Sequence, residues 1–261
     1  MTMTEVPDLS EIRRRKIAEI VEQRGAVAVR ELCDELGRSE ATIRRDLREL
    51  GRQGIVSRTH GGVMAKTSAA SDLPNDERKL IGWAEKQRIA QAAMDRLNGQ
   101  EVVFLDAGTT ALAVAELAGQ KPGCRYVTTC LGVAKRLKAQ GIRDFYVIGG
   151  SYLPVNDSFV GSLAIAGLRS LTFDVSFFCC SAVNVARECI EIGDEMYALI
   201  QREALASSRQ RLVIADHRKF ETYAFTRTAG FDEIDGLITN AELAADVVGQ
   251  LRGTGLEVVT A

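Results

Sequence analysis

The spacing of apolar residues near the start of the chain is that of short helices. After a candidate N-cap at Ser10, apolar residues recur at helical spacing until Gly25, which predicts a first helix. Val29–Leu36 has a similar pattern and predicts a second helix. Ser39 is placed to cap a third helix that extends to about Gln53, because its hydroxyl can accept from an N–H of the first turn.

Two short apolar stretches follow the third helix. Ile55–Arg58 and Val63–Met64 are joined through the turn-forming Thr59–Gly62, which is typical of a β-hairpin. Helices followed by a hairpin predict a winged helix-turn-helix domain over residues 9–64. The small, polar and turn-forming residues 65–79 are expected to form a linker.

Strand and helix patterns alternate over the rest of the chain. Such alternation predicts βα units and a mostly parallel sheet covered on both faces, and therefore an α/β domain over residues 80–261. The expected strands are Val102–Asp106, Tyr126–Thr129, Phe145–Ile148, Asp174–Cys180, Leu212–Asp216, Gly236–Thr239 and Glu257–Val259. The expected helices are Glu85–Leu97, Thr110–Ala118, Leu131–Gln140, Glu195–Ser207 and Ala241–Leu251.

The third predicted helix separates an apolar face from a basic one. On a helical wheel, Ile43, Leu47 and Leu50 form one narrow apolar stripe. A planar guanidinium can donate two hydrogen bonds to guanine or clamp a phosphate, so the basic face is expected to bind DNA. That face carries Ala41, Arg45, Arg48 and Arg52, with Arg44 at its side.

Residues around the basic face complete the predicted DNA contacts. Ser39 and Thr42 are expected to donate to phosphates and set the register. Arg58 and His60 in the predicted wing are expected to reach the backbone or the minor groove. The alternative is an ordinary solvated helix in which acids such as Asp46 pair with neighbouring arginines. The order of helix, glycine turn, capped basic helix and hairpin favours DNA binding.

Polar residues near the ends of the predicted strands outline a second candidate site. Ligands of parallel sheets bind outside the carboxyl ends of the strands. One strand runs directly into a glycine, two threonines and a helix start, which together form a cradle for a phosphate or a carboxylate. Ordinary turns, caps and surface side chains are the alternative for each member. The expected ligand-site residues are Asp106, Gly108, Thr109, Thr110, Gly149, Gly150, Asp174, Asp216 and Lys219.

Charge and composition limit the classes of protein to which the chain could belong. The net charge is −2, yet residues 1–66 carry 13 Lys and Arg against 11 Asp and Glu, so the excess negative charge lies in the remainder. The overall charge therefore does not exclude DNA binding. With six cysteines, two histidines and no C-x-x-C pair, no zinc site can be assembled at the usual spacings, and we expect no metal or cofactor.

The chain shows no sign of membrane insertion or secretion. No apolar run reaches the roughly 18 residues needed to cross a bilayer. The N-terminus lacks the basic and apolar regions of a secretory signal. We expect a cytoplasmic protein without membrane contacts.

The predicted winged helix resembles the DeoR family of bacterial transcription regulators. The resemblance is carried by Glu31–Cys33, Ser39–Leu47 and Gly54–Val63, and it continues in Glu85–Ala90, the Asp-x-Gly-Thr-Thr loop, the Gly149-Gly150 pair, Gly161, Asp174 and the Ala-Asp-x-x-Lys-Phe segment. It implies a DNA-binding domain and an effector domain similar in fold to ribose-5-phosphate isomerase, with a phosphorylated sugar as effector. The expected function is a repressor of carbohydrate-metabolism genes on double-stranded operator DNA, located at the nucleoid when bound.

Some residues depart from the family pattern. Thr129-Cys130 stands where the family usually has Thr-Asn, and Phe177–Asn184 replaces a small glycine-containing stretch. Tyr197 and Arg202 lie near the usual Glu and Lys of a later helix. The phosphate loop is retained, whereas retention of sugar-phosphate binding by the altered residues stays open.

Two other functions remain as alternatives. A sugar-phosphate isomerase needs clustered acids to move a proton, but only Asp174 opens the relevant strand, so we expect no enzyme. A regulator whose second domain only mediates oligomerisation is the other alternative. A homodimer or homotetramer is expected in either regulator, because two-fold symmetry lets two recognition helices read two half-sites.

Overall fold

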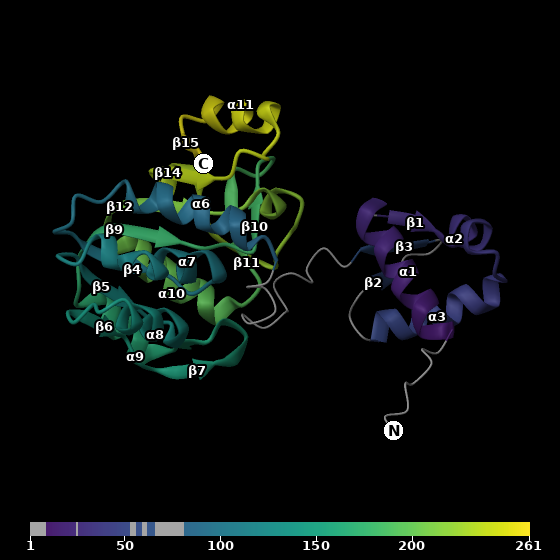
Figure 1. Cartoon of the computed structure of the whole chain (residues 1–261), viewed down its shortest axis with the longest axis horizontal. Helices are drawn as coiled ribbons and strands as arrows, with labels where there is room; N and C mark the ends of the chain where they lie inside the picture. The colour runs from purple at the N-terminus through teal and green to yellow at the C-terminus, as the bar shows by residue number, and fades with distance from the viewer. Residues whose placement is uncertain (1–8, 25, 53–55, 59–61, 66–80) are drawn as a thin grey trace, which may run out of the picture. The chain divides into compact units, whose positions relative to one another are not determined.

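The computed structural model describes residues 9–24, 26–52, 56–58, 62–65 and 81–261 (Figure 1). The chain divides into two compact units, Met1–Ala69 and Ala70–Ala261. Apart from Ala65, the predicted linker 65–79 lies outside the described residues.

The N-terminal unit is a winged helix-turn-helix, as predicted. Gly37 ends the second helix in the left-handed conformation, with φ of 60°, and its N–H donates to the carbonyl of Cys33. The sheet is antiparallel with strand order β1-β3-β2, and its first strand was not predicted. The elements are α1 (Leu9–Arg24), β1 (Ala26–Ala28), α2 (Val29–Leu36), α3 (Glu40–Arg52), β2 (Val56–Arg58) and β3 (Gly62–Ala65).

Helix α3 is held from its apolar side and by one ion pair. Ile43, Leu47 and Leu50 are at most 2% exposed and pack with Ile17, Ile20, Val21 and Leu32 in one core. The carboxylate of Asp46, also buried, accepts from Arg13 of α1 at 2.6 Å (Nε–Oδ2) and 3.2 Å (Nη2–Oδ1). Asp46 thus pairs across helices, not with an arginine of its own helix.

The C-terminal unit is built on a seven-stranded parallel sheet, which confirms the α/β prediction. Its order is β15-β14-β12-β9-β4-β5-β6, and Figure 1 shows these strands in this order from top to bottom. Each of the seven expected strands is present: β4 (Val102–Leu105), β5 (Arg125–Thr128), β6 (Phe145–Val147), β9 (Phe173–Phe178), β12 (Ser208–Ile214), β14 (Gly236–Thr239) and β15 (Glu257–Thr260).

The direction of winding reverses between β4 and β9. From β4 the chain continues to β5 and β6 on one side, and from β9 it continues to β12 on the other. Right-handed crossovers therefore place α7 and α8 on one face of the sheet and α10 on the opposite face. Such a reversal opens a crevice at the carboxyl ends of the two strands. The helices are α6 (Trp83–Met94), α7 (Thr109–Glu116), α8 (Leu131–Ala139), α9 (Ser162–Arg169), α10 (Glu195–Ala206) and α11 (Ala245–Gly253).

Smaller antiparallel elements flank this sheet, and the apolar pattern did not predict them. One is a three-stranded sheet of order β10-β11-β13, and the other is the hairpin β7-β8. None of the helices in the described parts of the chain is both long and apolar enough to cross a membrane. The strands are β7 (Ser151–Leu153), β8 (Ser158–Val160), β10 (Ala182–Asn184), β11 (Cys189–Ile192) and β13 (Thr226–Gly230).

We expect Asp46→Ala to destabilise the N-terminal unit because it removes the buried carboxylate that joins α3 to Arg13 of α1. The loss in the free energy of unfolding should be about 1–3 kcal/mol, measured by urea denaturation. Glu40→Ala is the control, because it removes only the exposed pair between Glu40 and Arg44, worth about 0.5 kcal/mol or less. Equal losses in the two variants would show that the Arg13–Asp46 pair stabilises the unit no more than the exposed Glu40–Arg44 pair does.

Candidate functional site

The basic face of α3 is open to solvent. Arg44, Arg45 and Arg48 are exposed, whereas Thr42 is half-buried. The Oγ of Ser39 lies 2.9 Å from the Oγ1 of Thr42 and accepts from the Thr42 N–H at 3.4 Å, so Ser39 caps the helix as predicted. Ala41, also exposed, offers a small side chain where another surface can approach closely.

The exposed arginines differ in their partners. Arg44 forms an i,i+4 ion pair with Glu40 at 2.6 Å, and Arg48 donates to the carbonyl of Arg44 at 3.3 Å. Arg45 has no ion-pair partner among the described residues. Of the three exposed arginines, Arg45 is therefore the one whose guanidinium is most available to a ligand.

The remaining expected DNA contacts fall outside what the structure describes. Arg52 belongs to α3 and Arg58 to β2, but the side chains of both residues lie outside the described part. His60 lies wholly outside the described residues.

Beside this face lies a hollow that was not predicted. It has a volume of about 570 Å³ and lies between α1 and α3. Arg14 of α1 contributes a further arginine, which the wheel of α3 alone could not reveal. The hollow is lined by Ser10, Arg13, Arg14, Ala41, Thr42, Arg45, Asp46 and Glu49.

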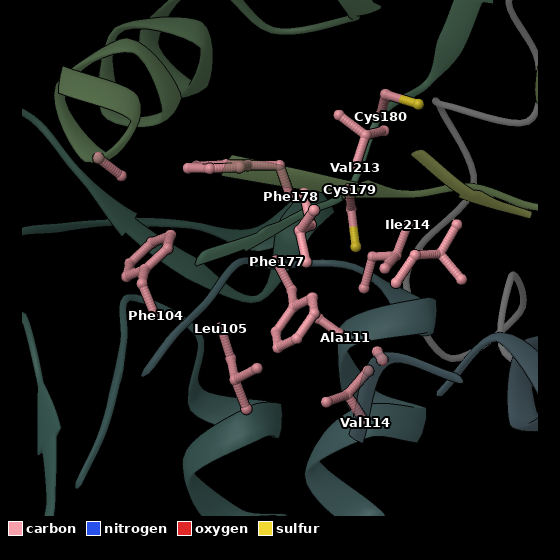
Figure 2. Packing of buried hydrophobic residues seen from close by; sticks show 14 of the residues in the cluster. Phe104, Leu105, Ala111, Val114, Phe177, Phe178, Cys179, Cys180, Val213 and Ile214 are labelled. Atoms are coloured by element: carbon pink, nitrogen blue, oxygen red, sulfur yellow. The ribbon is translucent and has the colours of Figure 1, made fainter. Parts of the chain in front are cut away.

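The predicted phosphate loop connects β4 to α7. A side chain at Gly108 would place its Cβ 2.7 Å from the Sγ of Cys179, so the loop can pass the end of β9 only with glycine at this position. Figure 2 shows Cys179 in an apolar cluster with Phe177 and Ala111. Thr109 and Thr110, both buried, form the first turn of α7.

Asp106 holds this loop from inside the protein. It is fully buried, and its carboxylate accepts from the Tyr197 hydroxyl, from Gln201 Nε2 at 2.6 Å and from the Cys179 N–H at 2.9 Å. Burial raises the pKa of Asp106 to about 6, and these hydrogen bonds oppose the rise. The structure therefore does not bring Asp106 to a surface where it could meet a ligand.

Tyr197 and Arg202, which depart from the family pattern, have structural roles in this protein. Tyr197 accepts from the Ala107 N–H at 2.8 Å while it donates to Asp106, so it ties α10 to the loop. Arg202 donates to the backbone carbonyls of Arg227 and Thr228 on β13.

A cationic cavity lies at the carboxyl edge of the sheet, next to the start of α7. Its volume is about 60 Å³. It brings together the predicted Thr109, Asp216 and Lys219 with residues that were not predicted. The lining residues are Ile81, Lys86, Thr109, Asp216, Arg218, Lys219 and Thr222.

Positive charge dominates this cavity. Arg218 Nε donates to Asp216 at 2.8 Å. Burial by itself would raise the pKa of Asp216, but the Arg218 hydrogen bond and the charges of Lys219, Arg218 and Lys86 lower it below its ordinary value. Three cations against one carboxylate, together with the N-terminus of α7, suit an anion.

Two of the missed residues left a signal in the sequence. Lys86 lies in the Glu85–Ala90 stretch, and Arg218 lies inside the Ala-Asp-x-x-Lys-Phe segment. Neither segment, taken by itself, indicates that α6 and the turn after β12 meet at α7. No group of three or more His, Cys, Asp or Glu in the described residues is arranged to hold a metal ion.

Six of the nine expected ligand residues do not line this cavity: Asp106, Gly108 and Thr110 in the loop before and at the start of α7, and Asp174, Gly149 and Gly150 elsewhere in the fold. Asp174 accepts from the Val102 N–H at 3.0 Å and pairs with Arg209 at 3.0 Å. Because Asp174 begins its strand, it lies at the opposite edge of the sheet, and its assignment to this site was wrong. Gly149 and Gly150 follow the edge strand β6, and a Cβ at Gly150 would lie 2.5 Å from the carbonyl oxygen of Val160. The absence of a side chain at Gly150 therefore allows the chain to pack closely against β8.

The altered Thr129-Cys130 pair follows β5 and is buried. The Cys130 N–H donates to Thr128 Oγ1 at 3.0 Å. Thr129 Oγ1 has no hydrogen-bond partner among the described residues. Neither residue lines the cationic cavity.

Both units match models of known domains. Residues 13–69 match the DeoR-like helix-turn-helix domain, and residues 83–241 match the DeoR C terminal sensor domain. The chain belongs to the DeoR family. This DeoR-family protein is a DNA-binding transcriptional regulator and not an enzyme, as expected.

Named relatives cover nearly the whole chain. It is 31% identical to the transcriptional repressor AccR of Agrobacterium fabrum, over 88% of this chain and 89% of that protein. It is 30% identical to the HTH-type transcriptional regulator GlpR of Haloferax volcanii, over 95% and 96% of the two chains. The lactose phosphotransferase system repressor of Staphylococcus aureus is 31% identical, over 88% and 92%.

Similarity to solved structures is partial. Ribose 5-phosphate isomerase A of Methanocaldococcus jannaschii gives a TM-score of 0.39 at 13% identity, over 52% of this chain and 53% of that chain. The delta subunit of eIF2B from Chaetomium thermophilum gives 0.44 at 19% identity, over 60% and 55%. Similarities at this level carry no argument about function.

We expect Asp106→Asn to remove a pH dependence of stability. The pKa of about 6 means that the folded protein keeps a proton that the unfolded chain, with a pKa near 4, has lost. The wild type should therefore lose about 2 kcal/mol relative to Asp106→Asn as the pH rises from 4 to 6. Urea unfolding of the two proteins across this range measures the difference.

Asp235→Asn serves as the control with the opposite sign. Its hydrogen bond from Arg211 lowers the pKa of Asp235. The wild type should thus gain stability relative to Asp235→Asn as the pH rises through the acidic range. A constant difference between wild type and Asp106→Asn at all pH values would contradict the raised pKa.

Proposed function

We propose that this regulator represses carbohydrate-metabolism genes and that a phosphorylated sugar controls its affinity for operator DNA. The cationic cavity at the start of α7 is the observation that carries this proposal. A sensor domain with three cations around a helix N-terminus is suited to a phosphate group. The name of the staphylococcal relative, a repressor of a lactose phosphotransferase system, supports a link to sugars.

The proposed DNA contacts are those of α3 and the wing. The exposed arginines lie opposite a buried apolar stripe, so α3 can enter the major groove without disturbing the core. Arg45 is proposed to read a base, and Ser39 and Thr42 to contact phosphates. Further proposed contacts are Ala41, Arg44, Arg48, Arg52, Arg58 and His60.

The proposed effector contacts are those that meet at the cavity. Thr109 lines the cavity from the first turn of α7, Thr110 follows it in that turn, and Lys219 provides a positive charge for a phosphate. Asp216 can accept from sugar hydroxyls. A ligand changes DNA affinity only if it binds one arrangement of the protein better than the other. A homodimer or homotetramer is proposed, since two α3 helices can then occupy two half-sites.

We expect Arg45→Ala to reduce sequence preference as well as affinity. Loss of a bidentate contact to guanine should reduce discrimination by about 1–3 kcal/mol, or roughly 10- to 100-fold. The measurement compares binding to an operator selected in vitro from random DNA with binding to unrelated DNA, at one stated salt concentration. Ser39→Ala is the comparison and should weaken binding to both DNAs evenly. If Arg45→Ala also weakens both evenly, Arg45 contacts only phosphate.

We expect Lys219→Met to abolish stabilisation by phosphorylated sugars. Wild type should show a rise in Tm that follows mass action with ribose 5-phosphate, glucose 6-phosphate or fructose 6-phosphate. Lys138→Met, at an exposed position in the last turn of α8, is the matched control and should retain the rise. If no phosphorylated sugar raises the Tm of wild type, the result favours the alternative in which the second domain only mediates oligomerisation.

A further inference from the structure

The cationic cavity is connected to the first residues described after the predicted linker. Ile81 lines the cavity, and its carbonyl oxygen accepts from Lys86 Nζ at 2.6 Å. Gly82 follows directly and caps α6. The Ile81–Gly82 segment, through which the chain enters the sensor domain, therefore contributes to the wall of the proposed effector site.

Arg218 lies against Gly82. Gly82 has a φ of +62°, and a Cβ built on it would lie 1.6 Å from Arg218 Nη2. The guanidinium therefore occupies the space that any other side chain at position 82 would need. Lys86 and Arg218 thus hold two successive residues of the entry segment, one through a carbonyl and the other through packing.

One nitrogen of this guanidinium lacks an acceptor. Arg218 Nε is bonded to Asp216, but Nη2 is buried without a hydrogen-bond partner among the described residues. An unpaired charged donor in a buried position is costly, so an acceptor that reaches it gains more than an ordinary surface hydrogen bond. An anion in the cavity would be such an acceptor.

The cavity is too small for a sugar phosphate as it stands. Its 60 Å³ corresponds to about two water molecules, whereas ligand pockets usually measure about 300 Å³ or more. Thr109 and Asp216 are buried at the ends of packed elements, but Ile81 is 44% exposed. The wall formed by Ile81, Gly82 and Arg218 is therefore the one that can move.

We propose that an anionic effector draws Arg218 away from Gly82 and so releases the point at which the sensor domain holds the incoming chain. This inference rests on the proposed effector site and adds the route by which occupancy reaches the DNA-binding unit. In the structure, Arg218 packs on Gly82. With a phosphate group bound, Nη2 donates to the phosphate, and the Ile81–Gly82 segment loses one of its two attachments.

The single tryptophan of the chain provides the probe. Trp83 directly follows Gly82 and is half-buried. The full-length protein is titrated with inorganic phosphate in phosphate-free buffer, while Trp83 emission and the heat of binding are recorded. We expect a saturable change in emission with the same midpoint as the calorimetric binding curve.

Gly82→Ala tests the contact directly. Its Cβ should displace the flexible end of Arg218, so emission should resemble that of the phosphate-bound wild type and change little when phosphate is added. Gly141→Ala is the matched control, because Gly141 also has a positive φ, of +75°, but nothing within 4 Å of the added Cβ. The control should respond as wild type does.

Arg218→Gln is the second variant, in case Gly82→Ala does not fold. Loss of the guanidinium should weaken phosphate binding about tenfold, and Trp83 emission should no longer respond at saturation. Binding by wild type without a change in Trp83 emission would overturn the proposed release and leave the effector site standing, as would a full response in Arg218→Gln. Absence of phosphate binding by wild type would overturn both the site and the release.

Discussion

The buried carboxylate of Asp106 is the constraint on which the sensor domain depends. A carboxylate without access to water is tolerated only where donors surround it. Those donors come from the end of β9, through the Cys179 N–H, and from α10, through Tyr197 and Gln201. The ends of β4 and β9 and the helix α10 therefore have to meet at Asp106. Because Tyr197 also accepts from the Ala107 N–H, the same contacts set the path of the loop that begins α7.

That path decides where an anion can be bound. The sheet reverses its winding between β4 and β9, so the loops after these strands diverge, and Thr109 at the start of α7 lines the cavity there. Gly108 lets the loop pass Cys179 closely. The turn after β12 then brings Arg218 and Lys219 to the space beside Thr109. The site thus combines a backbone cradle fixed by a buried acid with cations delivered from distant parts of the chain.

Apolar periodicity predicted the seven parallel strands and the helices of the winged domain, because burial imposes local repeats on these elements. The strands β1, β7, β8, β10, β11 and β13 were missed, since they form small antiparallel sheets outside the alternation of parallel strands and helices. In the site, Thr109, Asp216 and Lys219 were predictable as residues that follow strands. Asp174 was misplaced because it begins a strand. The pairs Arg13–Asp46 and Arg218–Gly82 join distant segments, which no local spacing encodes.

The two units differ in their distribution of charge. Residues 1–66 have a small excess of positive charge, and the arginines of α3 stand exposed on a convex helix that a polyanion can approach. The rest of the chain is net negative, so it repels DNA at long range. Within that acidic domain, Lys86, Arg218 and Lys219 meet around a small cavity. The basic groups of the acidic unit are therefore gathered at one small cavity, whereas those of α3 lie on an exposed helix face.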